Sequence, residues 1–456
     1  MPWLEAALAE TASYPSPSTL SVFEAHLDPQ WIEEALAATG TATLRRRRLP
    51  AERVLWLVLG MALMRDRPMY DVVSKLDLAL PGRGGEMRVA ASTVSQARER
   101  LGAKPLKWLF ERCSHEWSAK SAATYRWRGL SVFALDGSTL RVADSKENRD
   151  RFGLATGGKR GESGYPLVRV VTLIAARSHL VAAAAFGPYE NSEHHYADQL
   201  WSEIPVDSVT LLDRNFLAAR FMLGLQSAAN RHWLMRVKSN TKWRVKKVLG
   251  HDDLLVELAV SKNARQKDPS LPASFEARAV SYQVDKSKPK QWLLTSLLDP
   301  VQYPHAELVL LYHERWEIEL SLDEIKTHQL DRQETIRSRS VDGVEQEIWG
   351  VLLTYNLVRL EMQSIADEAR VLPSRISFVV AMRFIRDEWA WCAVASPGSI
   401  PEKLRRMRAN ILAFVLPPRR TARRYPRAVK IKMSNYAKKR GPARARPVAR
   451  PTSTAK

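Results

Sequence analysis

The spacing of hydrophobic residues divides the chain into helical and β-type regions. Residues 1 to about 125 have the periodicity of amphipathic helices, interrupted at LPGRGGE. From residue 130 the pattern changes to short β-type runs. These are SVFALDGSTLRV, YPLVRVVTLIAA, LVAAAAFGP and SVTLLDRNF, with a helix predicted near SEHHYADQLW. Three strands, a helix and another strand predict a mixed α/β sheet.

The second half of the chain again alternates between strand and helix patterns. Residues 220 to 310 contain short β-like pieces between basic loops, which predict a mainly β insertion: HWLMRVKSN, LLVELAV and KQWLLTSLL. Residues 341 to 400 return to helical periodicity, in GVEQEIWGVLLTYNLVRLEM and SRISFVVAMRFIRDEW.

The charged stretch LYHERWEIELSLDEIK, at 311–326, predicts a helix with two polar faces. On a projection of about 100° per residue, a stripe about 60° wide contains Tyr312, Arg315, Glu319 and Lys326. The opposite face contains Glu317 and Glu324 and is expected to face solvent, as on any surface helix. Because only one face can simply meet bulk water, we expect the stripe to line a cleft.

Charge indicates what that cleft binds. The formal net charge of +21 attracts polyanions, above all nucleic acid. The segment 419–456 contains 14 Lys and Arg and no acid, so removing this Pro-rich tail from the count leaves +7. We expect the tail to be disordered alone and to contact phosphates, with a solubilising terminus as the alternative. A second cluster, RRRR, lies at 45–48.

Composition excludes several other classes of protein. The longest hydrophobic run, VLWLVLGMALM, is too short to cross a bilayer, so no membrane partner is expected. Residues 1–44 contain no Lys or Arg, which argues against a secretory signal. Cys113 and Cys392 make neither a disulfide framework nor a zinc-finger spacing. We therefore expect a cytoplasmic protein.

A short basic helix in the N-terminal region is a candidate for DNA contact. In ASTVSQARERLG, Thr93 and Gln96 have capping-box spacing, and Gly102 is placed as a C-terminal stop. The helix would expose Gln96, Arg98 and Arg100 after a loop, as the reader of a helix-turn-helix does. A solvated basic face without a partner is the alternative.

Two aspartates interrupt or end hydrophobic runs. Asp136 interrupts VFALDGS, and Asp213 follows VTLL. An Asp that leaves a hydrophobic strand is costly unless it is paired or bound to a cation. A turn is the alternative for each, since Asp-Gly often starts one.

Two further sequence patterns are not expected to form functional sites. GLATGGKR has the spacing of a phosphate-binding loop, but Arg160 stands where Ser or Thr would ligate Mg²⁺, so no nucleotide cofactor is expected. His194 and His195 are adjacent, and adjacent helical residues cannot share a face, so surface residues are expected there rather than a metal site.

The polar stripe matches in full the YREK signature of bacterial insertion-sequence transposases of the DDE type. LDGST and LLDRNF, which contain Asp136 and Asp213, resemble the segments that bear this family's first and second aspartates. RRRRLPAERVLWLVLGMAL and STVSQARERLG resemble the N-terminal DNA-binding region of the subgroup typified by insertion sequence four. The likeness covers most of residues 20 to 430.

This resemblance implies a ribonuclease-H-like core, a mixed sheet with flanking helices, split by the β insertion. Asp136 would lie on the first strand, Asp213 at the end of the fourth, and Glu319 on the helix beside them. The expected parts are a helical DNA-binding domain at 1–125, the first part of the core at 126–220, the insertion at 221–308, the second part of the core at 309–340, a helical region at 341–416 and a basic disordered tail at 417–456.

The implied activity is cut-and-paste DNA transposition by a homodimer on the bacterial nucleoid. The enzyme would bind inverted-repeat ends, hydrolyse DNA and join the freed 3′ ends to target DNA. Two Mg²⁺ ions, for which Mn²⁺ can substitute, would activate the nucleophile and stabilise the departing oxygen. In this hypothesis Asp136 bridges both ions, and Asp213 and Glu319 hold one each. The remaining signature residues would meet DNA: Tyr312, Arg315 and Lys326.

Relatives with this signature are thought to pass through a DNA hairpin whose flipped base stacks on a Trp. Trp233, Trp243 and Trp292 are candidates, with core packing as the alternative for each. Two other functions stay open: a catalytically silent DNA-binding repressor derived from a transposase, and a ribonuclease-H-like nuclease without strand transfer. All six signature positions are intact, which argues against the repressor.

Overall fold

The computed structural model describes residues 23, 26–43, 47–81, 88–156, 162–227, 230–238, 240–283, 289–331, 335–392 and 395–417. All of these except Pro417 belong to one unit of the chain, Met1–Leu416. The basic tail predicted after residue 417 and the first half of the RRRR cluster lie outside the described residues.

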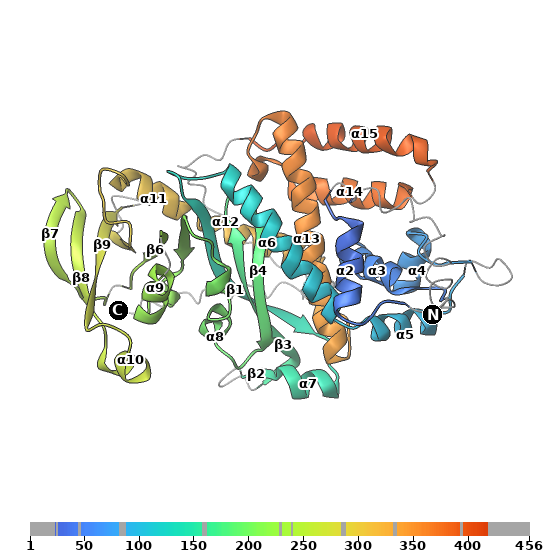
Figure 1. Ribbon diagram of the computed structural model, residues 1–456, viewed down its shortest axis with the longest axis horizontal. Helices are drawn as coiled ribbons and strands as arrows, with labels where there is room; N and C mark the ends of the chain where they lie inside the picture. The colour runs from blue at the N-terminus through green and yellow to red at the C-terminus, as the bar shows by residue number, and fades with distance from the viewer. Residues whose placement is uncertain are drawn as a thin grey trace, which may run out of the picture. The chain divides into compact units, whose positions relative to one another are not determined.

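Five strands form the central part of the sheet (Figure 1): β1 (Ser131–Val142), β3 (Glu162–Ala175), β4 (Leu180–Pro188), β5 (Ser208–Leu212) and β6 (Arg231–Arg236). Their spatial order is β4-β3-β1-β5-β6. β3 is antiparallel to β1 and to β4, whereas β5 runs parallel to both β1 and β6. This order of three antiparallel strands followed by two parallel ones is ribonuclease-H-like, and it confirms the predicted mixed sheet.

The β insertion extends the same sheet. Outward from β6 lie β10 (Gln291–Thr295), β9 (Ser274–Tyr282), β8 (Asp253–Ala259) and β7 (Arg244–Gly250), each antiparallel to its neighbour. β6 falls within the stretch that the sequence assigns to the insertion, yet it pairs with β5 in the core. Its central residues are buried, as expected of a strand with neighbours on both edges.

The N-terminal helices are α2 (Pro29–Ala38), α3 (Ala51–Leu63), α4 (Met69–Lys75), α5 (Ala91–Leu101) and α6 (Lys104–Thr124). Nearly every residue of α3 is buried, and α3 packs against the long helix α13 (Val341–Ala369). A Cβ on Gly350 of α13 would lie 2.5 Å from Val58 Cγ1. Only glycine allows the two helices to approach so closely. The N-terminal helices therefore share a packed core with the rest of the unit.

Helix α5 begins two residues before the predicted capping box. Its first residue is Ala91, and no side chain caps it, so Thr93 and Gln96 do not act as a capping box. Its end is as predicted. Gly102 has φ 67°, and its N–H donates to the Arg98 carbonyl oxygen. Glycine adopts this left-handed conformation at little cost.

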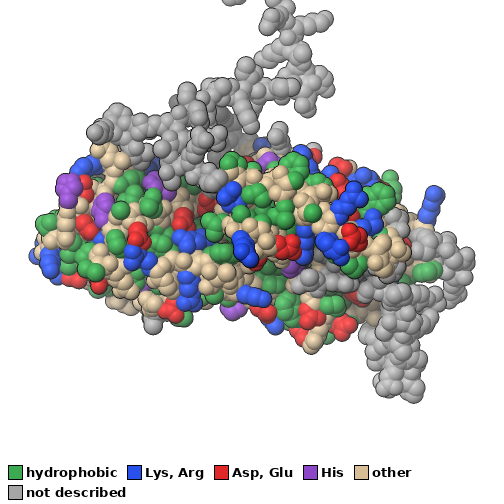
Figure 2. All heavy atoms as spheres, turned by 90° about the horizontal axis from the view of Figure 1, so that it is seen from above, with side chains coloured by type: hydrophobic (Ala, Val, Ile, Leu, Met, Phe, Trp, Pro, Cys, Tyr) green, Lys and Arg blue, Asp and Glu red, His purple; other side chains and the backbone are tan. Residues whose placement is uncertain are grey.

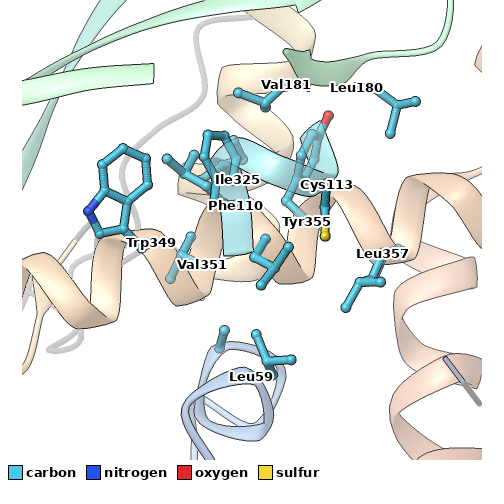
Figure 3. Close-up of a cluster of buried hydrophobic side chains, with 14 of the residues drawn as sticks. Leu59, Phe110, Cys113, Leu180, Val181, Ile325, Trp349, Val351, Tyr355 and Leu357 are labelled. Atoms are coloured by element: carbon cyan, nitrogen blue, oxygen red, sulfur yellow. The ribbon is translucent and has the colours of Figure 1, made fainter. Parts of the chain in front are cut away.

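The larger hydrophobic core lies where α3, α6, β4, α13 and the short π-helix η5 (Glu324–Gln329) meet (Figure 3). Phe110 and Cys113 come from α6, and Ile325 comes from η5. Both cysteines are free and buried, and burial raises the pKa of each thiol. The core fixes η5, and with it one end of the charged segment, against α13.

The remaining elements are shorter or lie near the C-terminal end of the unit. They are α7 (Lys146–Phe152), β2 (Leu154–Thr156), α8 (Glu193–Ala197), η3 (Trp201–Glu203), η4 (Arg214–Phe216), α9 (Ala219–Gln226), α10 (Lys262–Lys267), α11 (His305–His313), α12 (Trp316–Asp323), β11 (Thr335–Ile336), η6 (Pro373–Arg375), α14 (Phe378–Cys392), η7 (Pro397–Ser399) and α15 (Ile400–Leu412).

Surface charge is mixed on the face drawn in Figure 2, where the described Lys and Arg side chains lie among acidic and hydrophobic ones. This agrees with a net charge concentrated in the tail sequence. None of the helices in the described ranges has the length and hydropathy needed to cross a bilayer.

Candidate active site

The two predicted aspartates meet at one edge of the sheet. β1 and β5 are parallel, and Leu135 pairs with Leu212, so Asp136 and Asp213 occupy the next position on each strand. β1 continues to Val142, so Asp136 lies within a strand and the alternative of a turn is wrong there. β5 ends at Leu212, and the Asp213 carboxylate accepts a hydrogen bond from the Asn215 N–H.

Burial and neighbouring charges act together on Asp136. The pKa of Asp136 is raised to about 6, mainly by burial and to a smaller extent by the nearby Asp213 and Glu193 carboxylates. A 2.8 Å hydrogen bond from the Gly137 N–H and the charge of Arg315 oppose this rise.

The segment that carries Glu319 is not one continuous helix, which corrects the predicted projection. α11 ends at His313, α12 starts at Trp316, and a π-helical turn begins at Glu324. Around the break the N–H groups of Glu314 and Arg315 bond to carbonyl oxygens three residues back rather than four. Such bonds advance about 120° per residue. Residues beyond the break therefore face directions that a constant 100° period does not predict.

Glu317 and Glu324 consequently face the protein interior, and the prediction that they face solvent is wrong. Their side chains are 15% and 16% exposed. The ring of His179, in the β3–β4 turn, lies between them, with Nε2 2.6 Å from Glu317 Oε2 and Nδ1 3.4 Å from Glu324 Oε2. Tyr355 donates a 2.7 Å hydrogen bond to Glu324, and Arg359 lies 3.3 Å away. These contacts anchor the segment to the sheet and to α13.

The charge state of Glu324 follows from that environment. Burial alone would raise its pKa, but the cationic Arg359, His179 and the Tyr355 hydroxyl together lower the pKa to about 2. Glu324 is therefore ionised at neutral pH and acts as a structural anion. No periodicity in the sequence distinguishes His179, so its role as an anchor was not predicted.

Glu319 is held by its own helix. Arg315 donates a 2.7 Å hydrogen bond to Glu319 Oε1, four residues along. The same guanidinium is influenced electrostatically by Asp136 and Tyr312, and its side chain is 14% exposed. Arg315 is thus bonded to Glu319 and lies within electrostatic reach of Asp136.

The other two signature residues differ in their surroundings. Tyr312 is 8% exposed, and burial raises the pKa of its hydroxyl to about 12, with Asp213 among the neighbours that contribute. It therefore belongs to the same cluster as the aspartates. Lys326 lies on η5, three residues beyond the end of α12, and is half-buried.

The predicted DNA-contacting residues of α5 fall into two groups. Gln96 and Arg100 are exposed. Arg98 instead donates a 2.9 Å hydrogen bond to Gln346 of α13 and a 3.3 Å bond to Ser338. The hypothesis that Arg98 contacts DNA is corrected accordingly, because its guanidinium joins α5 to α13.

The Trp and His residues named from the sequence also differ in their surroundings. Trp233 is fully buried, which excludes base stacking in this conformation. Trp243 and Trp292 pack edge to face with their ring centroids 5.6 Å apart. His194 lies 2.8 Å from the Asn215 carbonyl oxygen, through its Nε2, and so joins α8 to the segment after Asp213. The second half of the phosphate-loop-like segment, 157–160, lies outside the described residues.

The donor chemistry of the site fits a divalent cation. Asp136 and Asp213 supply oxygen ligands, which Mg²⁺-type ions prefer. Beside Asp136, its cross-strand neighbour Thr172 has a buried hydroxyl without a hydrogen-bond partner among the described residues. Among the residues that the structure describes, no three acidic, His or Cys side chains already lie close enough together to hold a metal.

Comparison with known proteins places this site in a family. Residues 17–111 match the family described as insertion element 4 transposase N-terminal, and residues 127–357 match the transposase DDE domain. The chain is 37% identical over 417 residues to the Escherichia coli K12 transposase InsG for insertion sequence element IS4, covering 90% of this chain and 92% of that one. This chain belongs to the IS4 family of transposases.

Two other similarities accompany this assignment. The transposase is 36% identical over 225 residues to the putative transposase InsZ of Escherichia coli K12, covering 49% of this chain and 74% of that one. A solved structure described as the piggyBac transposase synaptic complex with hairpin DNA aligns with a TM-score of 0.45 and 12% identity, over 88% of this chain and 85% of that one. As a DDE-type transposase, the enzyme binds DNA and depends on divalent metal ions.

Proposed function

We propose that Asp136, Asp213 and Glu319 are the catalytic metal ligands of this transposase, and that the metal is a pair of Mg²⁺ ions for which Mn²⁺ substitutes. The alignment of β1 with β5 carries the proposal, because it sets two carboxylates side by side. The raised pKa of Asp136, caused mainly by burial, supports it, since a bound cation would stabilise the ionised carboxylate that burial disfavours. When bound, the metal would activate the attacking oxygen and stabilise the departing one.

Arg315 links metal binding to DNA binding in this proposal. In the structure its guanidinium is bonded to Glu319. Once Glu319 turns toward the aspartates, that guanidinium is released beside the cleft and meets a DNA phosphate, for which its planar fork is suited. Tyr312 contributes a neutral hydroxyl donor, and Lys326 contributes a second cation. The exposed Gln96 and Arg100 extend DNA contact to α5.

The biological reaction that follows is cut-and-paste transposition by a homodimer on two inverted-repeat ends. Water frees a 3′ end, and that 3′-hydroxyl then attacks target DNA, so one phosphodiester is exchanged for another. No nucleotide cofactor is needed for this exchange. The basic segment 419–456 adds contacts to phosphates, and the reaction takes place on the nucleoid.

Cleavage of DNA bearing the element's ends tests the ligand assignment. Asp136→Asn, Asp213→Asn and Glu319→Gln should each lower metal-dependent cleavage by orders of magnitude at saturating DNA, whereas binding of the ends should persist. Asp323→Asn is the matched control, because Asp323 is a 58% exposed acid on the same helix as Glu319. Full cleavage by Glu319→Gln, or full cleavage in EDTA, would refute the assignment. Cleavage without joining would identify a nuclease instead.

A further inference from the structure

The turn between β3 and β4, residues 176–179, binds the charged segment just before α12. Arg177 of this turn donates two hydrogen bonds to the Glu314 carboxylate, through Nε at 2.8 Å and Nη2 at 2.7 Å. Such a paired contact fixes direction as well as distance, because the guanidinium is planar. Nη1 of the same side chain donates to the carbonyl oxygens of Tyr125 and Arg126, at 3.4 and 3.0 Å, just after the end of α6. Arg177 therefore ties the break between α11 and α12 to α6.

His179 of the same turn holds the segment beyond the break. Its side chain is 1% exposed, and its φ of 65° lies in the left-handed region, where such a backbone persists when surrounding contacts hold it. The ring contacts Glu317 near the start of α12 and Glu324 just after its end. These acids are seven residues apart, about two helical turns, and so lie on the same side of the helix. A rotation of α12 about its axis would break one of the two contacts.

Glu319 projects from another side of the same short helix. It lies two residues after Glu317, which corresponds to about 200° around the axis. Burial agrees, since Ser321, on the side of Glu317, is 1% exposed, whereas the Glu319 side chain is 38% exposed. A rotation of about 10° would move a carboxylate that lies about 5 Å from the axis by about 1 Å. A misplacement of about 1 Å can lower a catalytic rate by about a hundredfold.

We propose that Arg177 and His179 are positioning residues for catalysis, which together set the rotation of α12 and so direct Glu319 toward the metal site. The inference rests on the proposed function, in which Glu319 is a metal ligand. Each positioning residue acts through the acid that it holds rather than by contact with metal or DNA. The turn is suited to this role because it continues from β3, which pairs with β1, the strand that carries Asp136. One pair of strands thus holds the first acid and directs the third.

Cleavage of end DNA at saturating DNA, over a range of Mn²⁺ concentrations, tests this role. His179→Ala and Arg177→Ala should each lower the maximal rate by about tenfold to a hundredfold and raise the Mn²⁺ concentration needed for half-maximal cleavage. Affinity for end DNA should stay within about twofold of the parent, since the change affects only the reacting geometry. Arg149→Ala is the matched control, because it also removes a paired arginine–carboxylate contact, with Asp144, and it should cleave as the parent does.

Conservative variants and a second measurement separate positioning from general stability. His179→Gln and Arg177→Lys each keep a donor for the acid, so they should show smaller changes in the same direction, and they carry the test if the alanine variants do not fold. Hydrogen exchange in EDTA gives a readout independent of cleavage. Amides of residues 314–324 should exchange faster in the variants, whereas those of β1 should exchange as in the parent.

Glu319→Gln is the reference that separates this inference from the proposed function. Loss of cleavage by Glu319→Gln, with the parental rate and Mn²⁺ requirement in the Arg177 and His179 variants, would overturn the positioning role and leave the metal assignment intact. Parental cleavage by Glu319→Gln would overturn the metal assignment, and the positioning role with it. Faster exchange throughout the chain, or an equal loss of cleavage by Arg149→Ala, would also overturn the inference, because it would reflect general destabilisation or loss of charge.

Discussion

Replacing Asp136 by Asn should stabilise the transposase at neutral pH in the presence of EDTA, even though the proposed role of Asp136 predicts a loss of cleavage. The pKa of Asp136 is raised from 3.8 to about 6, mainly by burial. Because the folded-state pKa is the higher one, ionisation costs nothing below pH 4, and the cost grows as pH rises through about 6. This rise corresponds to at most about 3 kcal/mol at pH 7. The neutral amide of Asn avoids that cost while keeping the size of the side chain.

Urea unfolding in EDTA, at pH 4 and pH 7.5, measures the effect. The Asp136→Asn chain should unfold at higher urea than the parent at pH 7.5, and the two midpoints should converge at pH 4. Asp323→Asn should show no such pH-dependent gain, because Asp323 is exposed. An Asp136→Asn chain that is less stable than the parent at pH 7.5, or equally displaced at both pH values, would refute the electrostatic reasoning.

Two further predictions concern packing around the site. Glu324→Gln leaves the buried Arg359 facing a neutral amide and should cost about 3–5 kcal/mol at pH 7 by urea unfolding. Because the pKa of Glu324 is lowered to about 2, that stabilisation is present above pH 4.5 and lost toward pH 2, so the two chains should converge in acid. Gly350→Ala should cost about 1–3 kcal/mol by thermal unfolding, because its Cβ would overlap Val58. Gly224→Ala, whose Cβ would meet nothing within 4 Å, should be neutral or stabilising, and equal losses at both glycines would contradict the packing argument.

The central strands could be predicted because their signals are local. The runs SVFALDGSTLRV and LVAAAAFGP coincide with β1 and β4, since period and length alone specify a buried strand. β9 was missed because its pattern contains Arg278. That side chain is fully buried and bonded to Asp253 at 2.7 Å, and no local pattern reveals a partner 25 residues away.

The charged segment shows where local periodicity fails. The projection assumes one continuous α-helix. The structure instead has hydrogen bonds to carbonyl oxygens three residues back just before Trp316, and a π-helical turn that begins at Glu324. Glu317 and Glu324 look like surface acids in sequence, because the side chain that contacts both, His179, lies 138 and 145 residues earlier. The spacing of Tyr312, Arg315 and Glu319 matches the family signature, but it does not show that Arg315 donates a hydrogen bond to Glu319.

The pairing of β6 with β10 determines where residues can be inserted into or deleted from this chain. Arg236 and Leu293 are direct neighbours in the sheet, so the chain leaves the core and returns to it at adjacent positions. A loop whose ends already meet can be shortened or lengthened at its far hairpin, β7–β8, with little change in closure entropy. Residues added or removed there would leave the spacing between Asp213 and Glu319 in space unchanged. The outer hairpin is therefore where a reporter peptide could be inserted with the least disturbance of the catalytic edge.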